Sequence, residues 1–198
     1  MYRNVKGIMG TCPRDSTYWG INGSKPSPFI TGALNYFHDD NYRILAADYG
    51  WTSTAEDRFK IGYEYAKNNI DLLTMDLKAG EQFNFVSHSM GAALTEGIAK
   101  YLNEKGFGVS NIVHINPYQA ADISTLESAN TIDYQNIDDP VIHFIPFSSS
   151  GKIQNADQYV REFSDESLYY RHFWPISLGK NFWDRLERNS YRSGTYFY

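Results

Sequence analysis

The sequence predicts an α/β fold with a mostly parallel, doubly wound sheet that helices cover on both faces. Two observations carry this prediction: short apolar segments of strand length occur along the chain, and longer amphipathic segments alternate with them. A third observation concerns organisation. The 198 residues suffice for one core, and no Pro- or Ser-rich linker, repeat or low-complexity run divides them. We therefore expect a single domain over residues 1–198, without an insertion large enough to form a lid.

The expected elements follow from local patterns. Strands are predicted over residues 5–9, 42–47, 83–87, 111–115 and 141–147. Between the first two strands, a long segment rich in Gly and Pro predicts a loop followed by a short helix. A helix is predicted over about residues 54–77, with Thr54 as its cap, and a last helix over about residues 175–188.

Composition excludes several function classes. The formal net charge of −5 argues against nucleic acid as a partner. No run of 18 apolar residues is present, and residues 1–4 lead directly into a strand without the apolar segment of a signal peptide. Cys12 is the only cysteine, so we expect no internal disulfide, and no zinc, phosphate or dinucleotide motif occurs. The sequence therefore predicts no cofactor and no metal, and it leaves the localisation open.

Residues 83–92, Phe-Asn-Phe-Val-Ser-His-Ser-Met-Gly-Ala, are the most informative stretch. They combine a buried strand, a tight turn and the start of a helix whose apolar residues recur on one face. A nucleophile on such a turn needs small residues two positions before and after it, and Ser87 and Gly91 are small. This pattern indicates that Ser89 is a nucleophile. The alternative is that Ser89 only caps the helix.

The string Ser-His-Ser-Met-Gly at residues 87–91 resembles the nucleophile elbow of bacterial lipases in the α/β-hydrolase family. Residues 4–10, Asn-Val-Lys-Gly-Ile-Met-Gly, resemble the strand and oxyanion loop of the small, cap-less lipases, with Lys6 where that family has His. The resemblance implies a minimal α/β-hydrolase and a serine esterase or lipase. It also implies that the backbone N–H groups of Ile8 and Met90 form the oxyanion hole.

A nucleophilic serine needs a histidine base and an acid that orients it, and in this family the order along the chain is Ser, acid, His. His172 lies in an aromatic segment just before the last predicted helix, where the family has its catalytic histidine. Asp157 is the expected acid and Asp122 the alternative, because relatives place the acid in either region. His88, next to Ser89, is expected to pack.

Other candidates for these roles are weaker. His114 and His143 lie inside predicted strands, which favours core positions for both. Asp138 and Asp139 come just before the last predicted strand, at the end of the sheet away from a ligand site. Asn116 stands where some relatives have the acid, and an amide cannot stabilise an imidazolium as a carboxylate does, so we expect it to shape a turn.

The substrate is a weaker inference. Aromatic residues make up 16% of the chain, which favours contact with a lipid surface or a protein partner, although an aromatic core is the simpler explanation. Tyr18 and Trp19 are candidates for substrate contact, or they pack on the sheet. We expect a carboxylic ester of a lipid, phospholipids included, or a small ester.

Residues 83–125 also resemble lipase-like domains at the C-terminal ends of Rhs-type proteins of Bacteroidetes. That resemblance implies an exported antibacterial toxin domain with an immunity protein as its partner. An alternative from another class is a binding module that retains the fold without turnover. The departures at Lys6 and Ser87 favour this alternative.

Overall fold

The described strands form one six-stranded sheet in the order β2-β1-β3-β4-β5-β6, and each neighbouring pair is parallel. The computed structural model describes residues 5–11, 26–39, 42–46, 53–75, 77–143, 151–164, 166–168 and 170–190. The strands are β1 (Val5–Thr11), β2 (Tyr42–Ala46), β3 (Gln82–His88), β4 (Val109–Ile115), β5 (Asn130–Asn136) and β6 (Gln158–Glu162).

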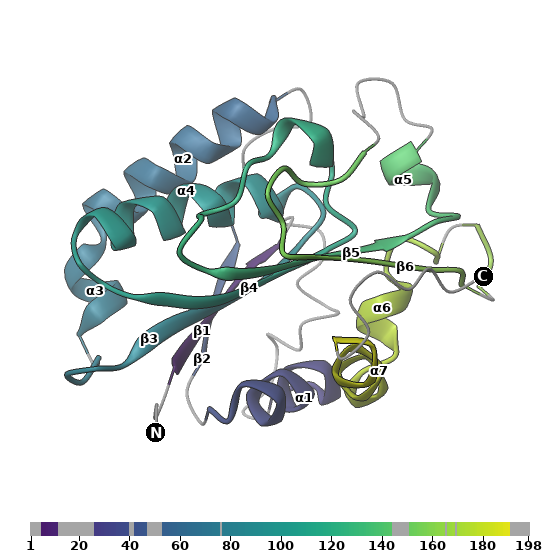
Figure 1. Cartoon of the computed structure of the whole chain (residues 1–198), viewed down its shortest axis with the longest axis horizontal. Coiled ribbons are helices and arrows are strands. Elements are labelled where there is room, and N and C mark those ends of the chain that lie inside the picture. The colour runs from purple at the N-terminus through teal and green to yellow at the C-terminus, as the bar shows by residue number, and fades with distance from the viewer. Residues whose placement is uncertain are drawn as a thin grey trace.

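Helices lie on both faces of the sheet. They are α1 (Pro28–Phe37), α2 (Ala55–Asn68), α3 (Ile70–Thr74), α4 (Gly91–Glu104), α5 (Pro140–His143), α6 (Trp174–Ser177) and α7 (Lys180–Ser190). Figure 1 shows α2, α3 and α4 over one face and α1, α6 and α7 over the other. The predicted fold class, a mainly parallel sheet between two helical layers, is therefore confirmed.

The two cores follow from the alternation of side chains along each strand. On β3, Phe83 and Phe85 pack with α4, whereas Val86 joins the cluster that contains α1 and α7. The residues that β3 and β4 contribute to the two clusters are at most 4% exposed. The same alternation directs Ser87 to the α4 face and His88 to the opposite face, which matters for the site described below.

The helices α2 and α4 pack closely because each has a glycine at the contact. A Cβ added at Gly62 would lie 2.0 Å from the carbonyl oxygen of Leu94, and one added at Gly97 would lie 2.0 Å from that of Phe59. No side chain larger than hydrogen fits at these distances. The contact fixes α4, and with it the helix end that follows Ser89.

The observed helix ends agree in part with those predicted from the sequence. Thr54 caps α2 with a capping box, as predicted, but the predicted helix over residues 54–77 is divided at Asn69 into α2 and α3. The last predicted helix is likewise divided, because Gly179 has a φ of +57° between α6 and α7. Among the described helices, none is both long and apolar enough to cross a bilayer.

The prediction of a strand over residues 141–147 is wrong for residues 141–143, the part of that range that the structure describes. Residues 140–143 form the helix α5, and the strand at this point of the fold is β5, which precedes it. β6 was also missed. Both strands have polar sequences, Asn-Thr-Ile-Asp-Tyr-Gln-Asn and Gln-Tyr-Val-Arg-Glu, so they lack the apolar pattern that marks a buried strand.

Candidate active site

Ser89 lies on the turn between β3 and α4, as predicted. Its φ of +55° is in the left-handed region, which a non-glycine residue adopts rarely and at some cost. Its N–H donates to the carbonyl oxygen of Ile115 at 3.0 Å, and its own carbonyl accepts from the N–H of Ala92 at 3.2 Å. These contacts hold the strained turn between the end of β4 and the first turn of α4.

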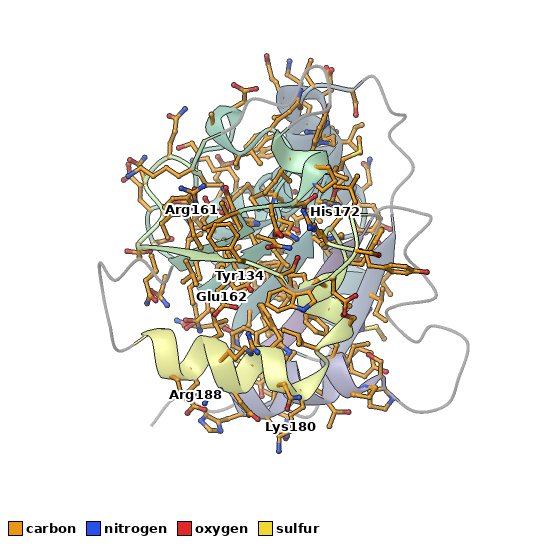
Figure 2. All side chains as sticks on the ribbon, turned by 90° about the vertical axis from the view of Figure 1, so that its right-hand side faces the viewer. Tyr134, Arg161, Glu162, His172, Lys180 and Arg188 are labelled. Carbon is orange, nitrogen blue, oxygen red and sulfur yellow. The ribbon has the colours of Figure 1, made fainter. Side chains whose placement is uncertain are left out.

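The histidine predicted as the base lies at the same edge of the sheet. The carbonyl oxygen of His172 accepts hydrogen bonds from His88 Nε2 and from Asn116 Nδ2, each at 2.9 Å. The rings of His88 and His172 have centroids 4.5 Å apart. Because Ser89 directly follows His88, the fold brings residues 89 and 172 to one end of the strands. Figure 2 shows His172 well away from α7.

His172 is paired with Asp139, which the sequence predicts at the opposite end of the sheet. His172 Nδ1 lies 2.5 Å from Asp139 Oδ2, and the other carboxylate oxygen accepts from the N–H of Val141 at 2.8 Å. Asp139 is fully buried and His172 is 5% exposed. The carboxylate can only accept, so Nδ1 carries a proton, and in the neutral ring Nε2 is left as an acceptor. This is the state that a general base requires.

The residues that precede His172 and Asp139, namely Arg171 and Asp138, form a second pair beside the first. Arg171 Nε lies 3.3 Å from Asp138 Oδ2, so two consecutive acids at the end of β5 face Arg171 and His172. Asn136 Nδ2 donates to the carbonyl oxygen of Arg171 at 2.9 Å. The segment that contains the histidine is therefore tied to the carboxyl end of β5 through side chains and backbone.

The prediction that Asp157 pairs with His172 is wrong. Asp157 Oδ2 accepts from the N–H of Thr131 at 2.7 Å, near the amino end of β5. Thr131 and Asn136 are five residues apart on this strand, about 16 Å. The prediction of Asp157 as the acid depended on the predicted strand over residues 141–147, which the structure contradicts at residues 141–143. Asp139 follows β5 rather than preceding a strand, so it lies at the carboxyl edge, where ligands bind in such sheets.

The remaining predicted site residues differ in their placement. Met90 occupies the N-cap position of α4, directly after Ser89. Ile8 lies inside β1 in register with Phe85, four residues before Ser89, so its N–H is about 13 Å from the elbow along the strand. The prediction of Ile8 as an oxyanion donor is therefore corrected. Asp122 is exposed in a short 3₁₀ helix.

Two predicted substrate contacts, Tyr18 and Trp19, lie outside the described residues, as does Cys12. His114 is a core residue, as expected, and it hydrogen bonds to Ser87 and Glu96. Within the described ranges, no group of three or more His, Cys, Asp or Glu side chains is arranged to hold a metal ion.

Asn116 has a larger role than the turn residue that the sequence suggested. Its φ of +46° directs the chain at the end of β4, and its amide bridges two segments. Nδ2 donates to the His172 carbonyl, and Oδ1 accepts from the N–H of Asn136 at 2.7 Å. Asn116 thus joins the ends of β4 and β5 to the segment that contains the histidine. An acid at this position would lack the donor.

Comparison with known proteins supports the fold. No protein-family model and no curated protein matches the sequence. A Lactobacillus plantarum protein named as a cell surface hydrolase superposes with a TM-score of 0.52 at 13% identity, over 98% of this chain and 100% of that one.

Two further structures superpose more loosely. The type II thioesterase of the yersiniabactin pathway has a TM-score of 0.48 at 8% identity, over 95% of this chain and 94% of its own. A Xanthomonas campestris α/β serine hydrolase without a lid has a TM-score of 0.42 at 12% identity, over 91% and 82%. With the parallel sheet and the strand–turn–helix at Ser89, the first similarity identifies the architecture: the chain has a minimal α/β-hydrolase fold.

Proposed function

We propose that this protein is a serine hydrolase that cleaves carboxylic esters, with Ser89 as nucleophile, His172 as general base and Asp139 as the acid that orients it. The observation that carries the proposal is the convergence at one sheet edge of a strained serine turn and a buried His–Asp pair. Both features carry a cost to stability. A left-handed serine is strained, and a buried carboxylate needs partners to offset its desolvation.

The proposed reaction proceeds in two steps. Ser89 Oγ attacks the ester carbonyl carbon while His172 Nε2 takes the hydroxyl proton, and Asp139 stabilises the resulting imidazolium. The Met90 N–H, at the N-terminal end of α4, donates to the oxyanion. His172 then gives its proton to the departing alkoxide, which leaves as the alcohol, and the acyl group stays on Ser89.

In the second step a water molecule releases the acyl group. His172 takes a proton from the water molecule while the water oxygen attacks the acyl carbon. The bond between the acyl carbon and Ser89 Oγ then breaks. The proton returns to Ser89, the carboxylic acid leaves, and the enzyme is regenerated. No cofactor is required at any step.

Exposed apolar side chains support lipids as the substrate class. Phe163, Leu168 and Tyr170 are each more than half exposed, and all three lie in the segment between β6 and His172. Large apolar residues that stay exposed in one short segment mark a surface for an apolar ligand or a membrane. Their position within ten residues of His172 along the chain favours esters with long acyl chains, presented at a lipid surface.

A series of nitrophenyl esters of increasing acyl length tests the proposal. We expect the wild type to hydrolyse the series with higher kcat/KM for chains of about eight carbons or more, since each buried methylene contributes about 0.8 kcal/mol. Ser89→Ala should reduce hydrolysis of every ester to background. Leu168→Ser should lower activity on long esters and leave the shortest unchanged.

Two results would favour a function other than the one proposed. Equal activity on all chain lengths would favour an esterase for small substrates. Absence of hydrolysis with every ester, in a chain shown to be folded, would favour a binding module without turnover.

A further inference from the structure

A second Ser–His–acid chain lies behind the nucleophile, on the α4 face of the sheet. Ser87 Oγ is 2.6 Å from His114 Nδ1, and His114 Nε2 is 2.8 Å from Glu96 Oε1. The other carboxylate oxygen of Glu96 accepts from the N–H of Leu126 at 2.9 Å. The three side chains are at most 1% exposed. Each link is therefore made inside the core, where an unmade hydrogen bond is costly.

The direction of these hydrogen bonds follows from the acid. The Glu96 carboxylate accepts at both oxygens, so His114 Nε2 carries the proton that faces it. In the neutral ring Nδ1 is then an acceptor, and the Ser87 hydroxyl donates to it. The order of donors matches that of a catalytic relay. Ser87 is fully buried, however, so no substrate reaches it, and the chain is not a second active site.

The chain connects the two limbs of the elbow. Ser87 is on β3, two residues before Ser89, and Glu96 is on α4, seven residues after it. His114 on β4 joins them, and Leu126 extends the link to the segment that precedes β5. The strained turn at Ser89 is thus held by a hydrogen-bonded bridge between the strand that enters it and the helix that leaves it.

The opposite face of β3 is held as well. His88, whose side chain points away from α4, donates to the carbonyl oxygen of His172. Consecutive residues at the end of this strand therefore have three separate contacts: Ser87 with the layer under α4, His88 with the histidine segment, and Ser89 with the turn. A shift of β3 against α4 would move Ser89 relative to His172.

We propose that Ser87, His114 and Glu96 form a positioning relay that aligns Ser89 with its base. This inference rests on the proposed hydrolase function. It also explains why position 87 has a serine where the usual elbow has glycine, because a glycine would leave Nδ1 of the buried His114 without its donor. The three residues act through the elbow and do not touch the substrate.

The test is a double-mutant cycle on kcat. Ser87→Ala, Glu96→Gln and the double variant are assayed with a short, soluble nitrophenyl ester, and kcat is expressed per site that a fluorophosphonate can titrate. We expect Ser87→Ala to lower kcat about tenfold while KM changes less than about twofold, since small misplacements of a nucleophile reduce rate rather than binding. The double variant should be no slower than the slower single variant, because both changes break one chain.

A matched control separates alignment from general stability. Asn84, which is 1% exposed, accepts at Oδ1 from Asn111 Nδ2 at 2.7 Å, so this half-buried pair also joins β3 to β4, but three residues further from the elbow. Asn84→Ala should lower the Tm and leave kcat per titrated site unchanged. Ser87→Gly provides a second variant at position 87, and we expect it to lower kcat as Ser87→Ala does.

The outcomes are distinguishable. If Ser87→Ala and Ser87→Gly lower the Tm but retain the wild-type kcat per site, the relay has no positioning role and the inference is overturned, while the hydrolase function stands. Additive losses in the double variant would also contradict it. If the folded wild type does not react with the fluorophosphonate, the hydrolase function fails, and the inference fails with it.

Discussion

Replacing Asp139 by Asn tests the pairing that the structure assigns to His172. The amide oxygen of Asn can still accept from the N–H of Val141, which the carboxylate does at 2.8 Å. The amide nitrogen would then face His172 Nδ1, now 2.5 Å from a carboxylate oxygen. Since that nitrogen donates, the ring is favoured with Nδ1 unprotonated and Nε2 protonated. In this tautomer Nε2 cannot take a proton from Ser89.

The expected loss is large because both the tautomer and the charge change at a buried site. In a well-studied serine protease the equivalent substitution lowers kcat about 10⁴-fold. We expect a decrease of about 10³- to 10⁴-fold here, which corresponds to about 4–5.5 kcal/mol of transition-state stabilisation. KM should change little, because Asp139 is fully buried and lies behind the ring.

The assay is steady-state hydrolysis of a short nitrophenyl ester, with the folded fraction checked by circular dichroism. Asp157→Asn is the matched control, because Asp157 contacts a backbone N–H at the other end of β5, and its kcat should stay within about twofold of the wild type. The reasoning is refuted if Asp157→Asn abolishes hydrolysis or if folded Asp139→Asn retains wild-type kcat.

Three further predictions concern stability and alignment. Gly97→Ala would place a methyl group 2.0 Å from the Phe59 carbonyl oxygen, so urea unfolding should show a loss of about 3 kcal/mol. Burial raises the pKa of Asp133 from 3.8 to about 6, so the folded chain binds this proton more tightly than the unfolded chain, and stability falls by up to about 3 kcal/mol as pH rises through that window. The stability of Asp133→Asn relative to wild type should therefore increase from about pH 4 to about pH 7 in urea titrations. A constant difference would contradict the shift. Asn116→Asp removes the donor to the His172 carbonyl, and we expect kcat to fall about tenfold at constant KM in the ester assay.

The elbow was predictable from sequence because its signals are local. A strand, a turn with small residues on both sides of Ser89 and an amphipathic helix follow each other within about twenty residues. His172 could be ranked above the other histidines because its position between the last strand and the last helices is a matter of chain order. In the structure His172 lies between β6 and α6, and its role as the base stays a prediction.

The proposed acid, Asp139, was not predictable from sequence, because its place in the sheet depends on β5, a strand with a polar sequence. On β5, Asp133, Gln135 and Asn136 are buried, and each finds hydrogen-bond partners in the fold. Such partners are distant in sequence, so no local pattern reveals that the segment is buried. The apolar run that follows, from Val141, has the pattern expected of a buried strand, although residues 140–143 form the helix α5. A strand at that point would place Asp139 at the amino end of the sheet, whereas Asp139 follows β5 and lies at the carboxyl end.

The role of Ser87 was hidden for a similar reason. In the sequence it is a departure from the usual elbow, and it weakens the motif. Its partners lie 27 residues further on at His114 and, through that ring, on α4 at Glu96. A hydrogen-bonded chain across two strands and a helix becomes visible only when the register of β3 and β4 is known.

The most direct measurement is covalent labelling by a fluorophosphonate, followed by peptide mapping with mass spectrometry. We predict one adduct per chain, on the peptide that contains Ser89, and a labelling rate that falls by about 10³-fold or more in His172→Ala. An adduct on another residue, or a Ser89 adduct that forms equally fast without the imidazole, would contradict it.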